Sequence, residues 1–183
     1  MMEMFIYESI AFENVFKIRF RCFGDEKRGS KKIYDASEGG VFSILGFHCD
    51  EMMALHSRRG VLRGMHYQIV SPQTKVIYVL QGRLFIAVVD LRKHEKTYGK
   101  WFGISVSESD SFGLYVPGDF AIGTLAEKDS SFLMLYSGQY IDGHEKGFRF
   151  DDADVGIVWT LPRNEMQVAD KDKSLPLFRD REK

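Results

Sequence analysis

The sequence predicts an all-β fold, a sandwich or barrel of antiparallel strands. Three observations favour it. The 183 residues include fifteen Phe and eight Tyr but only four Pro, and the aromatic and β-branched residues gather in short runs. Turn residues separate these runs at near-regular spacing, which is typical of antiparallel sheets. Long amphipathic helical windows are hard to find, so no helical crossover is available to build a parallel sheet.

The first third of the chain predicts one half-buried strand and several shorter elements. From Phe5 to Phe23, apolar residues recur at strand spacing and Lys or Arg occupies alternate positions. Residues 24–30 are rich in Gly and charge and predict a turn or loop. A short apolar strand is expected over Val41 to Leu45. The segment 49–59 is ambiguous, and its residues 51–55 are compatible with one helical turn.

The strongest strand signal lies in the middle of the chain. Two β-branched runs, Val76 to Leu80 and Leu84 to Leu91, flank a Gln81-Gly82 turn, which predicts a β-hairpin buried on at least one face. After Trp159 the composition becomes polar, and a short helix or an irregular tail is expected over 162–173. Between these regions lie four further expected strands, at 101–106, 113–116, 120–125 and 131–136.

Length and charge exclude several classes of function. A chain of this size is most simply one domain, residues 1–183, with a core large enough to need no cross-links. Its two cysteines, Cys22 and Cys49, form neither a disulfide framework nor a zinc set, which favours a reducing compartment. The net charge is -1 and both signs are interspersed, so the chain has no strong electrostatic field that would attract nucleic acid or a membrane surface. No apolar run has membrane-spanning length, so we expect a cytoplasmic protein.

The stretch Gly60 to Gln68 concentrates the most reactive side chains. If it is a regular strand, Arg63 and Met65 point to one face and Gly64 and His66 to the other. A lone histidine on an apolar face is more often a hydrogen-bonded core residue than a catalytic group. Whether His66 is a core residue or a catalytic group depends on which motifs occur elsewhere in the chain.

A metal site is not expected. Strand-rich barrels often bind a metal through two His one residue apart and a third His after a Pro-x-Gly turn. Here Tyr67 and Gln68 follow His66, and Ile122 stands where the later ligand would fall. With so few nitrogen or carboxylate ligands, neither a closed nor an open metal site can form.

A series of motifs resembles the dTDP-4-dehydrorhamnose 3,5-epimerase family, the RmlC-like cupins, in order and spacing over nearly the whole chain. The resemblance implies a cupin jelly roll, or double-stranded β-helix, with short helices that are mainly C-terminal. It also implies a homodimer with exchanged N-terminal strands. The motifs are Gly60 to Gln68, Gln73-Thr74-Lys75, Val89 to Arg92, Thr97 to Trp101, Val116 to Ala121, His144 to Gly147, Asp151-Asp152, Val155 to Trp159 and Lys171-Asp172.

The resemblance implies a cofactor-free reaction on a nucleotide-diphosphate sugar, in carbohydrate biosynthesis for cell-surface polysaccharides. The ketone of a 4-keto-6-deoxy sugar acidifies the hydrogens on C3 and C5, because the resulting carbanion delocalises onto the ketone oxygen. His66 is expected to be the general base. Asp172 is expected to fix its tautomer and stabilise the imidazolium.

The same resemblance assigns five substrate-binding residues. Arg63 and Lys75 match cations that hold the enolate oxygen or the diphosphate, and Arg28 matches an arginine that contacts the diphosphate. For these three, a solvated charge or an ion pair is the alternative. Tyr140 matches an aromatic residue of the sugar pocket, although a packed core tyrosine would explain it nearly as well. Gln68 completes the substrate-binding set.

The chain departs from the family pattern at the proton donor. Inversion requires an acid on the second face of the sugar, and the family tyrosine for that role aligns with Met134, which has no proton to donate. A second pocket histidine of the family aligns with Ile122. Tyr136 would lie on the same face as Met134 if the strand is regular. Further differences at Lys31 to Ile33 and Asp50 to Met52 remove the reason to expect thymidine in particular.

Three functional hypotheses remain. The first is an epimerase that inverts one carbon only or takes its proton from solvent. The second is an isomerase that acts on a different nucleotide sugar or on a free sugar. The third is a non-catalytic protein that binds a sugar nucleotide or a partner. Retention of His66 and Asp172 favours proton transfer, so the epimerase ranks first.

Overall fold

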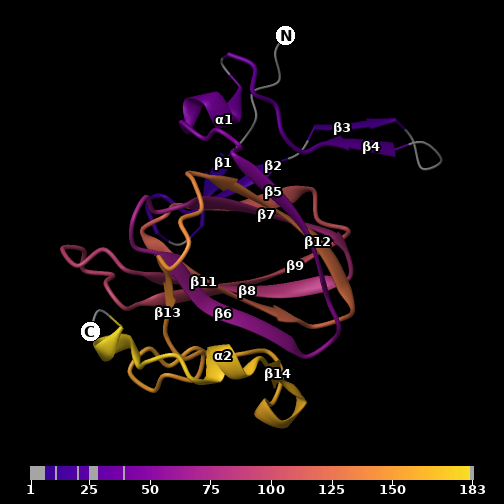
Figure 1. The fold of residues 1–183 in the computed structure, drawn as a ribbon. Helices are drawn as coiled ribbons and strands as arrows, with labels where there is room; N and C mark the ends of the chain where they lie inside the picture. Colours follow the sequence, from indigo (N-terminus) through magenta and orange to yellow (C-terminus); the bar gives the residue numbers. More distant parts are fainter. Residues whose placement is uncertain (1–6, 11, 20, 25–28, 39, 182–183) are drawn as a thin grey trace.

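The computed structural model describes residues 7–10, 12–19, 21–24, 29–38 and 40–181, and it confirms the all-β prediction (Figure 1). Two sheets face each other across an interior, and a small two-stranded hairpin projects from the body. Within the described residues, every strand pair is antiparallel except β14 with β6, which is parallel.

Each sheet is built from strands that are distant in sequence. The first sheet has the order β1 (Tyr7–Ser9), β2 (Phe16–Arg19), β10 (Phe112–Val116), β7 (Thr74–Gln81), β12 (Ser130–Ser137) and β5 (Glu51–Ser57). The second has the order β13 (Glu145–Gly147), β6 (Val61–Gln68), β11 (Phe120–Ala126), β8 (Arg83–Asp90) and β9 (Trp101–Ser107), with β14 (Gln167–Val168) beside β6. The hairpin consists of β3 (Arg21–Gly24) and β4 (Gly29–Lys32).

The helices are short and mainly C-terminal, as expected. They are α1 (Val41–Ile44), α2 (Asp170–Lys173) and the 3₁₀ turns η1 (Arg163–Glu165) and η2 (Phe178–Asp180). Within the described residues, no helix has the length and apolar character needed to cross a membrane.

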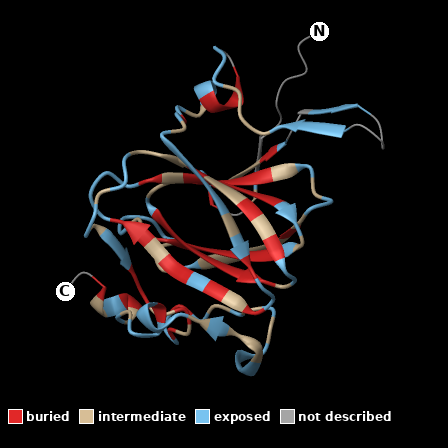
Figure 2. Cartoon of the chain, turned by 45° about the vertical axis from the view of Figure 1, so that its right-hand side comes forward, coloured by how far each residue is buried: buried red, intermediate tan, exposed pale blue. Residues whose placement is uncertain are grey.

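The central strands are buried on both faces, which explains their continuous apolar runs (Figure 2). Along β7, Ile77 faces the interior between the sheets, whereas Tyr78 lies in an outer cluster with Phe42 of α1. Along β8, Ile86 faces the interior and Phe85 packs in a second outer cluster with the C-terminal segment. Three apolar layers therefore stabilise the fold: one between the sheets and one on the outside of each sheet.

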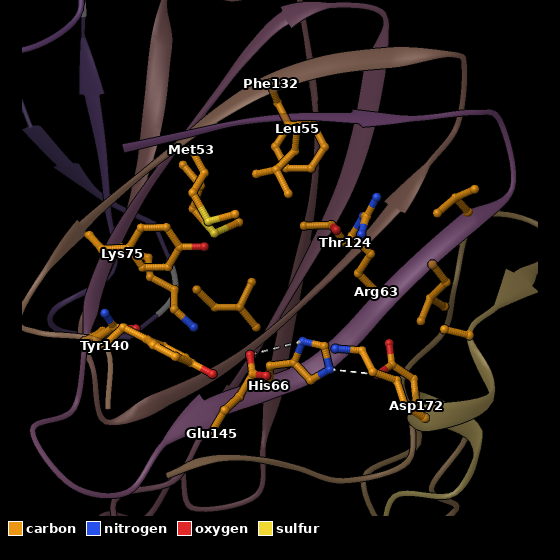
Figure 3. Close-up of a pocket in the computed structure, with 18 of the residues that line it drawn as sticks. Met53, Leu55, Arg63, His66, Lys75, Thr124, Phe132, Tyr140, Glu145 and Asp172 are labelled. Carbon is orange, nitrogen blue, oxygen red and sulfur yellow. Dashed lines mark hydrogen bonds and ion pairs between the residues drawn. The ribbon is translucent and has the colours of Figure 1, made fainter. Parts of the chain in front are cut away.

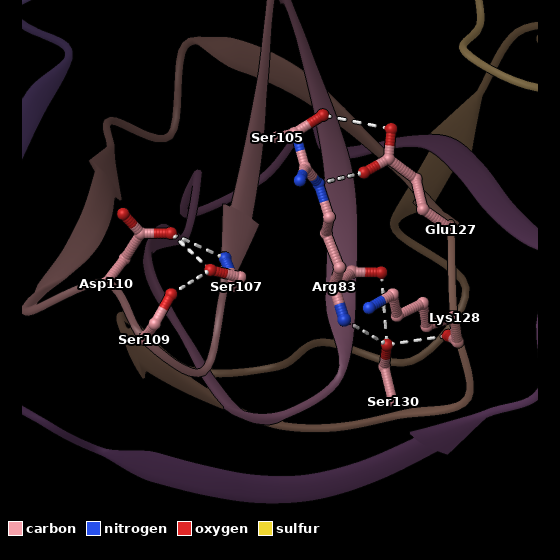
Figure 4. Close-up of polar contacts among 8 residues, drawn as sticks. All are labelled: Arg83, Ser105, Ser107, Ser109, Asp110, Glu127, Lys128 and Ser130. Carbon is pink, nitrogen blue, oxygen red and sulfur yellow. Dashed lines mark hydrogen bonds and ion pairs between the residues drawn. The ribbon is translucent and has the colours of Figure 1, made fainter.

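The hairpin predicted around Gln81-Gly82 is wrong. β7 lies in the first sheet and β8 in the second, so the turn between them is a corner where the chain changes sheets. Polar contacts hold this corner (Figure 4): Arg83 Nε donates to Glu127 Oε2 at 2.7 Å, and the Arg83 amide donates to Ser130 Oγ at 3.0 Å. The hairpin prediction failed because strands buried on both faces have the same continuous apolar sequence pattern whether or not they pair with each other.

Three other predicted elements differ from the structure. Val41 to Leu45 contains helix α1 and no strand, because Val41 and Phe42 pack as one turn against the first sheet. Residues 51–55 belong to strand β5, whose pairing with β12 overrides the local helical signal. The single strand predicted from Phe5 to Phe23 is divided among β1, β2 and β3. Of the predicted turn at 24–30, residues 25–28 lie outside the described part of the chain.

A buried carboxylate fixes the C-terminal segment that carries α2. Asp152 is 3% exposed, and its Oδ2 accepts the Phe178 amide at 2.7 Å. Its Oδ1 accepts the amides of Asp154 at 2.8 Å and Val155 at 3.2 Å. These bonds hold the chain on both sides of α2 against the second sheet.

Replacing Asp152 with alanine is expected to lower the free energy of unfolding by about 2–5 kcal/mol, because the buried amides of Val155 and Phe178 would lose their acceptor. The urea midpoint measures this loss. Asp154→Ala is the matched control, since Asp154 is exposed, and it should stay within about 0.5 kcal/mol of the parent protein. Equal midpoints for the two variants would contradict the anchoring role.

Candidate active site

A cavity of about 500 Å³ lies between the two sheets, and the segment that contains β14 and α2 contributes to its lining. Strands of both sheets contribute to its wall, and α2 closes one side. The lining residues include Glu51, Met53 and Leu55 of β5, Arg63 and His66 of β6, Lys75 of β7, Ile122 and Thr124 of β11, Phe132, Met134 and Tyr136 of β12, Tyr140, Glu145, Lys171 and Asp172.

The structure brings His66 and Asp172 together across 106 positions of sequence. Nε2 of His66 lies 2.9 Å from Oδ1 of Asp172, and Oδ2 of Asp172 accepts the Gly64 amide at 3.1 Å (Figure 3). Burial alone would raise the pKa of Asp172, but the bonds from His66 and Gly64 outweigh burial and lower it. An ionised carboxylate only accepts hydrogen bonds, so Nε2 carries the proton of the neutral ring and Nδ1 keeps a free lone pair.

Strand β6 is irregular where this pair is formed. His66 is opposite Ile122 and Arg63 is opposite Thr124, so three steps along β6 correspond to two along β11. This bulge places Arg63 and His66 together on the pocket wall and corrects the prediction, based on a regular strand, that they face opposite ways. Gly64, with φ +108°, is required here because a Cβ would lie 2.5 Å from the carbonyl oxygen of Ile122.

Glu145 is a pocket residue that the sequence analysis did not select. Its Oε1 lies 4.0 Å from Nδ1 of His66, longer than a hydrogen bond. Figure 3 shows the imidazole between Asp172 on one side and Glu145 on the other. Its position within the His144 to Gly147 motif was the available signal. The free lone pair of His66 therefore faces a polar, solvent-accessible part of the pocket.

Lys75 places a buried amino group in the pocket. The residue is 9% exposed, and its Nζ lies 5.9 Å from the ring centroid of Tyr136. Burial lowers its pKa from 10.5 to about 8, against the opposing charge of Glu145. Among the described residues, no carboxylate is bonded directly to this amine, and a buried amine of this kind is typical of a functional cation.

Two of the other predicted binding residues line the pocket, and the third lies outside the described part of the chain. Arg63 lines the pocket while donating to Ser57 Oγ at 3.2 Å and to the His56 carbonyl at 3.1 Å. Tyr140 lines it too and is 54% exposed, so it is no core tyrosine. Arg28 lies outside the described residues.

Gln68 is not among the residues that line the cavity, and its expected binding role stays a prediction. Its amide nitrogen donates to the carbonyls of Ser71 at 2.7 Å and Gln139 at 2.9 Å, and its oxygen accepts the Ile141 amide at 3.1 Å. These bonds connect two loops beside the pocket. The Gln68 side chain therefore uses both its amide nitrogen and its amide oxygen to hold these loops together.

Both departures from the family pattern, Met134 and Ile122, lie in the pocket wall, and so does Tyr136. The pairing of β12 with β7 is regular from Phe132 onward, which places Met134 and Tyr136 on one face as the sequence predicts. Burial raises the pKa of Tyr136 to about 12. In the described part of the chain, no cluster of three His, Cys, Asp or Glu side chains is arranged to hold a metal.

Comparison with known proteins identifies relatives of this site and fold. The model of the family described as dTDP-4-dehydrorhamnose 3,5-epimerase matches residues 9–180. The epimerase of Pseudomonas aeruginosa is 30% identical, over 93% of this chain and 94% of its own. That of Methanothermobacter thermautotrophicus is 37% identical, over 64% of this chain and 65% of its own length.

Solved structures share the architecture. The epimerase of Legionella pneumophila in complex with dTDP-4-keto-L-rhamnose superposes with a TM-score of 0.86 at 26% identity, covering 94% of this chain and 92% of that one. The fold is therefore the cupin jelly roll that the motifs predict.

Proposed function

The chain belongs to the dTDP-4-dehydrorhamnose 3,5-epimerase family, and on that premise we propose that it epimerises a nucleotide-linked 4-keto-6-deoxy sugar with His66 as the base. Nδ1 removes a proton from a carbon next to the C4 ketone, and Asp172 stabilises the imidazolium that forms. The observation that carries the proposal is the 2.9 Å contact between His66 Nε2 and Asp172 Oδ1, which leaves Nδ1 free at the pocket.

Lys75 supplies the charge that the intermediate needs. Proton removal shifts negative charge onto the ketone oxygen, and a fixed cation in a buried pocket stabilises such charge as it develops. Lys75 is the buried cation of the pocket wall, whereas Arg63 and Lys171 are exposed and suit the diphosphate. The pocket thus has one end for the reacting carbons and another for the nucleotide diphosphate.

The wild-type reaction in heavy water tests this function. A dTDP-linked 4-keto-6-deoxy sugar is incubated with the protein, and NMR follows deuterium at C3 and C5. Deuterium at one or both carbons, with inversion, is the expected result. A substrate that binds but acquires no deuterium at either carbon would contradict the function.

The value of kcat/KM is expected to fall as pH rises through about 8, because Lys75 loses its charge there. Below that pH the amine is charged and stabilises the enolate; above it the amine is neutral. This ratio reports the ionisations of the free enzyme. Lys75→Arg keeps its charge at alkaline pH and should lose this decline. A wild-type profile that stays flat across the pKa of Lys75 would contradict its role.

We further propose a homodimer in which N-terminal elements of one subunit pack on the other. The β3–β4 hairpin supports this, because it projects from the body in Figure 1 and Phe23 on it is 47% exposed. A projecting two-stranded ribbon is stable only when it packs against something. Sedimentation equilibrium should give twice the chain mass of 21.1 kDa. A single-chain mass would contradict the dimer.

A further inference from the structure

Inversion of a carbon needs a proton donor on the wall opposite the base. His66 belongs to β6 of the second sheet, so the donor should come from the first sheet, across the cavity. Met134 and Ile122 have no proton to give. The pocket therefore needs a donor that neither of these positions provides.

Tyr136 has the required position. It lies on β12 of the first sheet, two residues beyond Met134 and on the same face, so its backbone is about 7 Å farther along the strand. Its direct partner on β7 is Lys75. The tyrosine and the buried cation therefore enter the cavity side by side, opposite the second sheet and His66.

The hydroxyl of Tyr136 is available for proton transfer. Among the described residues, no side chain or backbone group is hydrogen-bonded to it. Burial keeps the phenol protonated over the neutral range. The amino group of Lys75, 5.9 Å from the ring centroid, would offset the charge of a transient tyrosinate.

We propose that Tyr136 is the general acid that protonates the face of the sugar opposite His66; this rests on the proposed function. In the first step, His66 Nδ1 takes the proton and the C–H electron pair forms the enolate. In the second step, the enolate carbon takes the phenolic proton of Tyr136, which becomes tyrosinate. Water then carries a proton from the imidazolium to the tyrosinate, so both groups return to their starting state.

Three other proton donors of the pocket, Glu145, Tyr140 and Lys75, are less well placed. Glu145 is on β13 of the second sheet, 4.0 Å from His66 itself, so it lies on the side of the base. Tyr140 follows β12 in a loop and is 54% exposed, so its hydroxyl is not held in the buried wall of the first sheet. Lys75 is needed as a cation at the ketone oxygen. Tyr136 alone among these four combines the opposite wall with a free acidic proton.

Tyr136→Phe tests the assignment in heavy water with a dTDP-linked 4-keto-6-deoxy sugar. Without the acid, His66 still removes the proton and, after exchange with solvent, returns deuterium to the same face. Inversion is expected to fall about 10²-fold or more, while deuterium enters the substrate with retained configuration at close to the wild-type exchange rate. Tyr34→Phe is the matched control, because Tyr34 packs in the outer cluster with Phe42 and does not line the pocket, and it should keep exchange and inversion coupled. Calorimetric binding of dTDP verifies that each variant is folded.

The outcomes separate this inference from the proposed function. Loss of inversion with retained exchange in Tyr136→Phe supports Tyr136 as the acid. Wild-type inversion in Tyr136→Phe, or loss of exchange and inversion together in a variant that binds dTDP normally, overturns it. Failure of the wild-type protein to exchange hydrogen at all would instead overturn the proposed function.

Discussion

Replacing Asp172 with asparagine is expected to lower kcat about 10⁴-fold without changing the shape of the pocket. Gly64 donates its amide to Oδ2 of Asp172, so the asparagine oxygen would keep that acceptor position and its NH₂ group would face His66. Nε2 would then have to accept a hydrogen bond. The ring proton would move to Nδ1 and block the lone pair that removes the substrate proton.

Asp170→Asn is the matched control for this substitution. Asp170 is on the same short helix, its side chain is 98% exposed, and it pairs with Lys173 instead of the pocket. Its kcat should stay at the wild-type value. Steady-state turnover of the dTDP-linked sugar measures both variants, and wild-type kcat in Asp172→Asn would contradict the tautomer mechanism.

The fold class and the His66–Asp172 contact were predictable, but for different reasons. The period of the apolar residues and the scarcity of helical windows predict an all-β fold from elementary rules. No spacing rule links residues 106 positions apart, so the contact came from the family motifs. Their order carries that long-range information because the motifs at 60–68 and 171–172 approach each other only in the folded chain.

The arrangement of the pocket wall was less predictable. The alternation rule assumes a regular strand, and the bulge at Gly64 in β6 breaks it, which brings Arg63 to the side of His66. Gln68 belongs to the same motif, yet its amide is hydrogen-bonded to two loops. The positions of these loops could not be predicted from the sequence. Glu145 approaches His66 only through the pairing of β13 with β6, so neither its distance nor its role follows from local pattern.

Lys75 and Tyr136 illustrate an intermediate case. The regular spacing of β12 predicted the face of Tyr136 from the sequence alone. Its neighbour was not predictable, because the strand that contains Lys75 was expected to pair with β8, whereas it pairs with β12 and β10. The partnership of a buried cation with a free phenol depends on that long-range pairing.

Replacing His66 with alanine is expected to lower the rate of deuterium exchange about 10⁴-fold, because no other pocket residue in the described part of the chain has a free ring-nitrogen lone pair and a second ring nitrogen bonded to a buried carboxylate. Binding of dTDP should persist, since Arg63 and Lys171, the exposed cations of the pocket, remain. His48→Ala is the control, as the His48 side chain is 79% exposed and bonded to Asp50.

The exchange rate of a dTDP-linked 4-keto-6-deoxy sugar in heavy water, compared between the wild-type protein and His66→Ala, tests the central claim most directly. Deuterium at C3 or C5 with the wild-type protein, and exchange slowed to near the uncatalysed rate in a variant that still binds dTDP, is the predicted result. Undiminished exchange in His66→Ala would contradict the assignment of His66 as the base.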